Sequence, residues 1–189
     1  MKNSILIIAI FAITLTSSLQ LTAQEFKSLD KSPMDVASFP SSYRVSDKIV
    51  KVTYSRPQLK GRDLVKLAPP GKIWRTGANE ATEITFYKDV VFGGKALKAG
   101  TYTLFTIPSY EGDWTVIINN ARNIWGSYYY NQDLDVVRVI GKTSKAETNI
   151  DAFSMMFDKD MTLKMGWGKT VISVSLSKKL IILLLFILV

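Results

Sequence analysis

A dense group of side chains able to bind a ligand lies in one stretch, residues 71–86. Its members supply an indole ring, a guanidinium, a carboxamide and a carboxylate: Trp74, Arg75, Asn79 and Glu80. A flat ring combined with directed hydrogen-bond donors and acceptors suits a sugar or another small polar ligand. Arg56 would add a second guanidinium for an anionic group if the basic loop after it folds over this stretch. These five residues form the predicted ligand site.

The same residues also permit a purely structural interpretation. Arg75 paired with Glu80, and Asn79 bonded to turn backbone, would fix a loop between strands, because buried polar groups need partners. Gly77 would then serve only the backbone conformation of that loop. The sequence leaves both interpretations open.

The chain contains neither cysteine nor histidine. This excludes disulfides, thiolate metal sites, a Ser-His-Asp triad and histidine-bound zinc. Paired carboxylates can hydrolyse glycosides without histidine, and Glu80 with Glu83 or Asp89 are the nearest candidates. Glu80 and Glu83 are expected to face opposite ways if both lie in a strand. We therefore assign no catalytic residue, no metal site and no cofactor, and whether the protein is an enzyme stays open.

The formal net charge is +8, but no run of basic residues occurs that would indicate nucleic-acid binding. A basic surface attracts anionic polysaccharide or lipid headgroups, although solubility alone also explains the charge. The predicted partner is therefore a small polar, anionic or carbohydrate ligand, with no nucleic acid.

Both chain ends are apolar. Residues 1–23 have the pattern of a signal peptide, with one Lys, an apolar segment and a small residue, Ala23, at the cleavage position. We therefore predict export to the periplasm or the cell exterior. Residues 180–189 form an apolar tail after Lys178 and Lys179, too short to span a membrane as a helix. A docked strand, an altered reading frame and membrane contact are the three interpretations of this tail.

The elements expected between the two ends, in residues 24–179, are mainly short strands. After a lead-in over residues 24–47, alternation and β-branched content predict ten segments: 48–54, 83–87, 90–92, 95–97, 101–107, 113–119, 135–140, 148–157, 161–167 and 171–176. Gly93-Gly94 predicts a hairpin turn, residues 63–67 a short helical turn, and residues 120–134 an aromatic loop packed on the body. This pattern predicts an all-β single domain, an antiparallel β-sandwich or barrel-like fold with few short helices.

Several strings resemble a secreted bacterial family catalogued as domain of unknown function 2911. They are Tyr54-Ser55-Arg56-Pro57, Lys60-Gly61-Arg62, the stretch Gly71 to Thr82 with its Trp-Arg-Thr-Gly-Ala-Asn-Glu-Ala core, Lys98 to Pro108, and Trp114 to Ile117 leading to Trp125-Gly126. The resemblance runs from about Ser32 to about Leu176 and implies an exported, β-rich single domain without an agreed activity. The chain departs from the family in the Pro69-Pro70 approach to Gly71 and in its apolar terminus.

The function expected from these observations is an exported binding or accessory module for a small polar or carbohydrate ligand. The alternatives are a carboxylate-based hydrolase that acts on a glycan, and a structural envelope protein.

Overall fold

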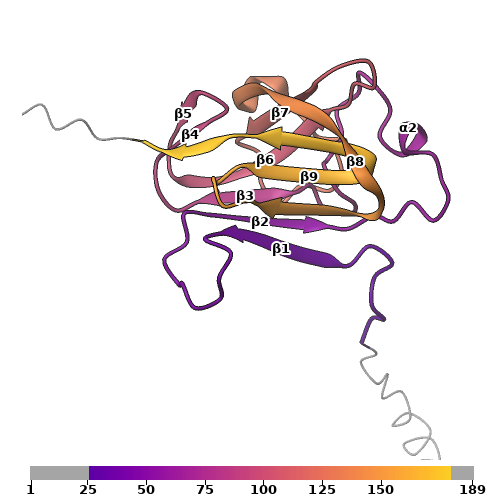
Figure 1. Cartoon of the computed structure of the whole chain (residues 1–189), viewed down its shortest axis with the longest axis horizontal. Helices are drawn as coiled ribbons and strands as arrows, with labels where there is room; N and C mark the ends of the chain where they lie inside the picture. The colour runs from indigo at the N-terminus through magenta and orange to yellow at the C-terminus, as the bar shows by residue number, and fades with distance from the viewer. Residues whose placement is uncertain (1–25, 180–189) are drawn as a thin grey trace, which may run out of the picture. The chain divides into compact units, whose positions relative to one another are not determined.

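The computed structural model describes residues 26–179 (Figure 1). The predicted signal peptide and the apolar tail lie outside these residues. Residues 26–30 belong to a separate N-terminal unit, and they have no regular secondary structure. The unit that begins at Lys31 is all-β, as predicted.

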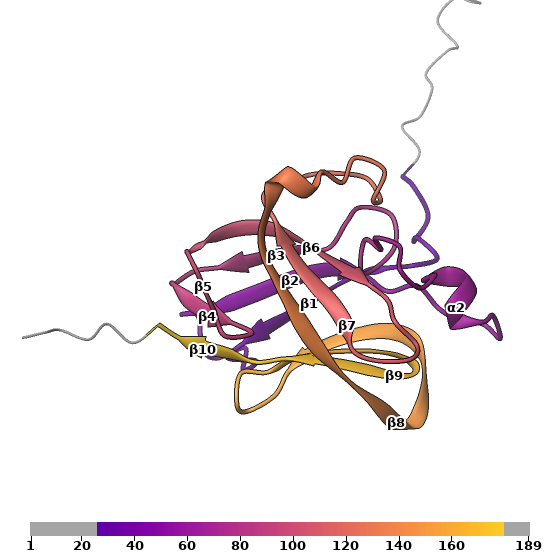
Figure 2. The same ribbon diagram turned by 90° about the horizontal axis from the view of Figure 1, so that it is seen from above.

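Seven antiparallel strands form the main sheet, in the order β1-β2-β3-β6-β7-β8-β9 (Figures 1 and 2). Their bounds are β1 Met34–Phe39, β2 Val50–Ser55, β3 Glu83–Phe86, β6 Gly100–Ile107, β7 Trp114–Asn119, β8 Asp135–Phe157 and β9 Leu163–Val174. Strand β8 is the longest, with 23 residues. The first part of β8 pairs with β7 and its second part with β9.

The main sheet curls so that the segment after β2 meets the second half of β8. The segment after β2 hydrogen-bonds to the second half of β8, where the Leu59 amide donates to the Asp151 carbonyl at 2.9 Å and the Phe153 amide to the Pro57 carbonyl at 2.9 Å. Figure 2 shows β8 crossing diagonally past β7 and turning back into β9. The result is a half-barrel, which confirms the barrel-like prediction.

A smaller sheet has the order β10-β4-β5, with β4 Val90–Phe92, β5 Lys95–Leu97 and β10 Leu176–Lys178. The β4–β5 turn is the predicted Gly93-Gly94 pair. Both glycines have positive φ, 54° and 84°, which a two-residue hairpin turn of this kind requires. The hairpin prediction is therefore confirmed.

The hydrophobic core fills the inside of the curled sheet. Alternation puts Val50, Val52 and Tyr54 of β2 on its inner face, and all three are buried, as the sequence predicted. Four aromatic rings pack at the centre: Trp74, Trp114, Phe153 and Trp167. Burial of rings of this size dominates the stability of a small core.

A second, smaller core lies on the opposite face of β6 and β7. It contains Ala81, Phe105 and Ile117, with Ile124 and Tyr130 packed against it. Ile124 and Tyr130 come from the aromatic loop, residues 120–134, so this loop packs on the body as predicted. The loop covers apolar side chains that would otherwise face water.

Three local features differ from or refine the expected elements. The lead-in contains β1, which was not predicted. Strand β8 joins the predicted segments 135–140 and 148–157, and β9 joins 161–167 to most of 171–176, whose last residue begins β10. The short helix is α2, Leu64–Leu67, and the Asp63 side chain caps it by accepting from the Val65 amide. Within residues 26–179, no helix has the length and apolarity that crossing a membrane requires.

Candidate functional site

The Trp-Arg-Thr-Gly-Ala-Asn-Glu-Ala stretch is a tight loop held by threonines. Thr76 Oγ1 lies 3.2 Å from Thr106 Oγ1, while Thr82 donates from its hydroxyl to the Thr76 carbonyl at 2.7 Å and from its amide to the Arg75 carbonyl at 3.1 Å. Thr76 has a φ of 55°, which is rare for a β-branched residue and needs the surrounding bonds to hold it. The loop is therefore rigid, but by threonines rather than by the predicted Arg75–Glu80 pair.

Trp74 lies in the core, where its ring is 8% exposed. Its backbone exchanges two hydrogen bonds with Thr106 of β6, at 2.8 and 3.0 Å, so it behaves as a short additional strand. The indole stacks on Trp167 with a centroid distance of 5.4 Å and an interplanar angle of 10°. The ring face that was predicted to contact a ligand is thus occupied by another indole of the protein.

Arg75 faces the other side of the sheet, because neighbours in an extended chain point to opposite faces. Its Nη1 lies 3.5 Å from the position that a Cβ on Gly126 would occupy, under the aromatic loop. The Nε atom is buried and has no hydrogen-bond partner in residues 26–179. In that part of the chain Arg75 and Glu80 form no ion pair, so the fully paired structural interpretation does not describe this loop.

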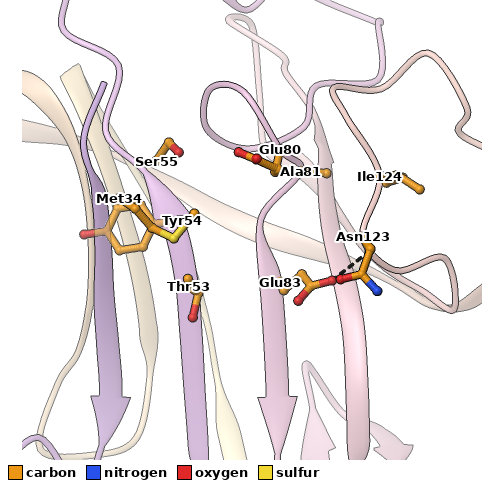
Figure 3. Close-up of a pocket in the computed structure, with 9 residues that line it drawn as sticks. All are labelled: Met34, Thr53, Tyr54, Ser55, Glu80, Ala81, Glu83, Asn123 and Ile124. Carbon is orange, nitrogen blue, oxygen red and sulfur yellow. Dashed lines mark hydrogen bonds between the residues drawn. The ribbon is translucent and has the colours of Figure 1, made fainter. Parts of the chain in front are cut away.

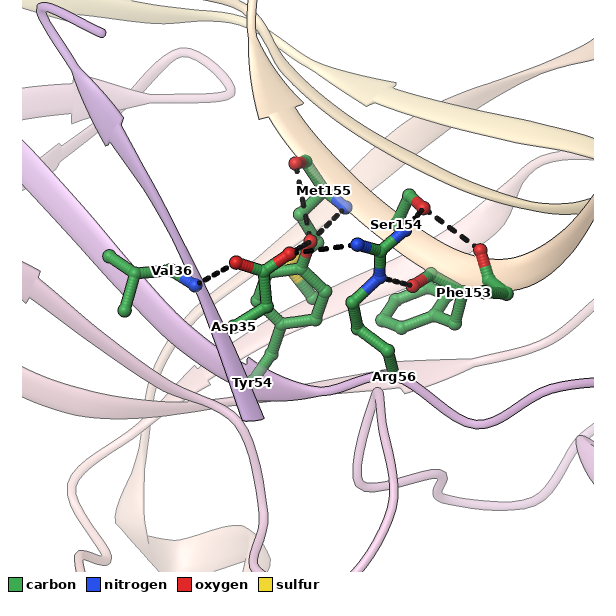
Figure 4. A network of polar contacts seen from close by, with 8 residues as sticks. Asp35, Val36, Tyr54, Arg56, Phe153, Ser154 and Met155 are labelled. Carbon is green, nitrogen blue, oxygen red and sulfur yellow. Dashed lines mark hydrogen bonds and ion pairs between the residues drawn. The ribbon is translucent and has the colours of Figure 1, made fainter. Parts of the chain in front are cut away.

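Arg56 is the centre of a polar network that joins three strands (Figure 4). Its Nη1 bonds Asp35 of β1 at 3.0 Å, its Nε donates to the Phe153 carbonyl at 3.1 Å, and its Nη2 donates to Ser154 Oγ at 2.7 Å. The Tyr54 hydroxyl accepts from the Met155 amide at 2.9 Å in the same network, and burial raises the pKa of Tyr54. The hydrogen-bond donors of Arg56 therefore link β1 to β8.

The aromatic loop is fastened to the predicted site by main-chain bonds. The Ala81 amide donates to the Ile124 carbonyl and the Gly126 amide to the Asn79 carbonyl, each at 2.9 Å. These two bonds flank a bridge between Glu80 and Trp125. In such an antiparallel pair both side chains stand on the same face of the ladder, close together.

The far end of the aromatic loop is fastened as well. The Tyr130 ring packs edge-on against Phe105 at a centroid distance of 5.1 Å, and its hydroxyl donates to Asp135 at 2.7 Å. Burial, and then the bond to Asp135, raise the pKa of Tyr130. Asn119, at the start of the loop, donates to the Asn131 carbonyl at 2.9 Å. The loop thus holds three exposed rings on a fixed backbone: Trp125, Tyr128 and Tyr129.

A cavity of about 240 Å³ opens beside the Glu80–Trp125 bridge (Figure 3). It lies between the start of β1, the end of β2 and the start of β3, next to the aromatic loop, and nine residues line it: Met34, Thr53, Tyr54, Ser55, Glu80, Ala81, Glu83, Asn123 and Ile124. The Glu80 carboxylate points across this space toward Ser55 in Figure 3. Glu83 accepts from the Asn123 amide at 2.9 Å through one carboxylate oxygen.

The cavity brings together two carboxylates that were expected to face opposite ways. That expectation was wrong because β3 begins only at Glu83, so Glu80 lies in the bend before the strand and does not follow its alternation. Asp89, the other carboxylate considered, is elsewhere and pairs with Lys98 at 2.9 Å. Within residues 26–179, no group of three or more acidic side chains is suited to hold a metal ion.

Of the five predicted site residues, the structure brings only Glu80 to the cavity wall, and Asn79 adjoins it through the bond to Gly126. Residues that the prediction did not include complete the wall. They come from β2, β3 and the aromatic loop, and they are Ser55, Glu83 and Asn123, with Trp125 beside Glu80. The density of aromatic residues in the loop was the one sequence signal that pointed to these residues. The long-range pairing that places the loop beside Glu80 has no such signal in the sequence.

The model of a family described as a protein of unknown function (DUF2911) matches residues 32–176. The chain belongs to this family. No curated protein and no solved structure matches it. The matched range of this DUF2911 protein includes every residue that lines the cavity and the whole aromatic loop.

Proposed function

We propose that this DUF2911 protein is an exported module that binds a small polar or carbohydrate ligand in the cavity between β2, β3 and the aromatic loop. The observation that carries the proposal is the Glu80–Trp125 bridge at the cavity. It sets an indole that is 55% exposed next to a carboxylate that makes no hydrogen bond within residues 26–179. An open ring face beside a hydrogen-bond acceptor is the pairing that sugar recognition uses.

The rigidity of this arrangement also supports a binding role. The backbone on both sides of the bridge is fixed by main-chain bonds, by the threonine loop and by the second core. A ligand that meets a pre-formed surface loses less free energy to the ordering of protein side chains. A volume of about 240 Å³ is below the usual range for drug-sized ligands, so one sugar ring or a molecule of similar size is the expected occupant.

A thermal-shift screen against monosaccharides, short oligosaccharides, peptides and anionic metabolites tests the proposal. We expect stabilisation by at least one saccharide in the wild-type protein and its loss in Trp125→Ala. Tyr43→Ala is the matched control, because Tyr43 is 87% exposed in a loop that does not line the cavity. Stabilisation by no compound, or equal stabilisation of Trp125→Ala, contradicts the proposal.

A second candidate function, hydrolysis of a glycan, rests on the observation that Glu80 and Glu83 line the same cavity. Glycoside hydrolysis needs one carboxyl group as acid and another as base or nucleophile. Release of reducing sugar from a glycan panel, abolished in both Glu80→Gln and Glu83→Gln, would favour it over binding alone.

Export is part of the proposal and rests on the pattern of residues 1–23. Expression of the full chain in a bacterial host followed by mass spectrometry of the periplasmic and medium fractions tests it. The expected mature protein begins at Gln24, whereas an uncleaved protein confined to the cytoplasm contradicts export.

A further inference from the structure

We propose that the cavity recognises a protonated amino group, so that its ligand is an amino sugar rather than a neutral one. This inference rests on the proposed binding function and adds the charge of the ligand to it. Three observations carry it: the charges of the cavity wall, a serine hydroxyl that is open to the cavity and has no partner within residues 26–179, and the apolar surface in the rest of the wall.

The ionic groups of the wall are all negative. Glu80 and Glu83 are its two charged residues, and none of the nine lining residues is Lys or Arg. The chain as a whole has a net charge of +8, so the charge of the cavity wall is opposite in sign to the net charge of the protein. A cation that enters the cavity is attracted by both carboxylates; Glu80 is exposed and Glu83 half-buried, so water screens the attraction to Glu80 more.

A hydroxyl group inside the cavity lacks a partner. Ser55 is 4% exposed and lines the cavity, yet its hydroxyl forms no hydrogen bond with any other residue in 26–179. In residues 26–179 the Ser55 oxygen is not among the fully buried side-chain atoms that lack a partner, so it is open to the cavity and can bond a ligand that enters. Figure 3 shows the hydroxyl on the side of the cavity that faces Glu80.

The acceptors of the wall match the donors of an ammonium group in number. An ammonium group has three N–H donors and no acceptor. Glu80 makes no hydrogen bond within residues 26–179, Glu83 uses one oxygen for the Asn123 amide and keeps the other, and the Ser55 hydroxyl oxygen is the third acceptor. Hydrogen bonds of an ammonium group to carboxylates are stronger than bonds between neutral groups.

The rest of the wall favours an organic cation over a metal ion. Met34, Ala81 and Ile124 supply apolar surface, which carbon atoms of a ligand can contact. A calcium ion takes six to eight oxygen ligands, and an apolar wall with two carboxylates does not supply them. Trp125 beside Glu80 offers its ring to the face of a sugar.

Isothermal titration calorimetry with three closely related sugars tests the inference. The probes are D-glucosamine, which carries an ammonium group, and D-glucose and N-acetyl-D-glucosamine, which do not. We expect glucosamine to bind at least about tenfold more tightly than either neutral sugar, as hydrogen bonds to charged groups imply. Glu80→Gln and Glu83→Gln should each remove most of this preference.

The variants are chosen so that folding does not obscure the result. Glutamine at position 83 still accepts from the Asn123 amide, and the Glu80 side chain has no bond within residues 26–179 to lose. Glu147→Gln removes the same charge from an exposed side chain outside the cavity and should leave the preference intact.

The possible failures separate the inference from the proposed function. Equal affinity for all three sugars overturns the amino-group inference and leaves a sugar-binding function standing. A preference for glucosamine that persists in both glutamine variants also overturns it, because the amino group then lies elsewhere. Binding of none of the three sugars overturns the inference, and the thermal-shift screen with its wider panel of compounds then decides whether the proposed function stands.

Discussion

Glu80 and Trp125 are 45 positions apart in the chain, yet they are direct cross-strand partners. The bonds from the Ala81 amide and to the Asn79 carbonyl fix the two residues, and their side chains stand on one face. Glu80 of this bridge lines the cavity, and so does Ile124, the neighbour of Trp125. The relationship therefore connects the segment that the sequence singled out with the aromatic loop, and it defines where a ligand is expected.

Trp74 and Trp125 should differ sharply in their effect on stability. Trp74→Ala removes a buried ring that packs on three other aromatic rings, so we expect a loss of about 3–5 kcal/mol in the free energy of unfolding. Trp125→Ala removes an exposed ring, and its cost should stay below about 1 kcal/mol. Urea denaturation followed by circular dichroism measures both. Similar costs for the two variants would contradict the placement of Trp74 in the core.

Substitution of Gly126 should loosen the aromatic loop, whereas substitution of Gly94, another glycine with positive φ, should not. Alanine at 126 or at 94 costs about 1–2 kcal/mol, because both positions have positive φ, 66° and 84°. At 126 the added Cβ would also come within 2.8 Å of the Tyr128 ring, whereas at 94 nothing lies within 4 Å. Hydrogen exchange should therefore be faster at residues 123–126 in Gly126→Ala only. Equal exchange in the two variants would show that the loop does not depend on this contact.

Arg56 should act on stability rather than on ligand affinity. Lysine cannot reproduce the fork that bonds Asp35, Phe153 and Ser154 together, so Arg56→Lys should lower the free energy of unfolding by about 1–2 kcal/mol. Arg122→Lys is the control, since Arg122 is exposed and has no bond within residues 26–179, and it should change stability by less than about 0.5 kcal/mol. An unchanged unfolding midpoint with weakened sugar binding in Arg56→Lys would make Arg56 a ligand contact instead.

The turn between β8 and β9 should contribute to acid sensitivity. The bond from the Thr162 amide, helped by Lys164 and the Asp160 amide, holds the pKa of Asp158 below its ordinary value of 3.8. The folded state therefore favours the ionised carboxylate, so its contribution is complete above pH 3.8 and is lost as the pH falls through the lower folded pKa. Wild type should exceed Asp158→Asn in stability at pH 7, and the difference should shrink at pH 3. A difference that is independent of pH would rule out this ionisation as its source.

Local patterns in the sequence were sufficient for much of the architecture. The alternation in β2 predicted which of its side chains are buried, and Gly93-Gly94 predicted the β4–β5 turn, because both depend on residues close in the chain. Strand β1 was missed because Pro33 and Pro40 bracket it and its side chains are only partly buried, so its hydrophobic alternation is weak.

The site was harder to predict because it depends on pairing between distant segments. Trp74 enters the core because it pairs with Thr106 of β6, and nothing near Trp74 in the sequence specifies that partner. Glu80 and Glu83 share a cavity because the strand begins between them, and a one-residue change in a strand boundary decides which face a side chain occupies. The polar density of the segment pointed to the correct region, while the residues that complete the wall come from β2 and the aromatic loop.

Amide chemical-shift mapping of the labelled protein during a titration with D-glucosamine tests the central claim most directly. We expect shifts concentrated at residues 53–55, 80–83 and 123–126, and no comparable shifts at the separate hollow around Tyr110 and Pro108. Shifts centred on that other hollow, or no shift at saturating sugar, would contradict a ligand site between β2, β3 and the aromatic loop.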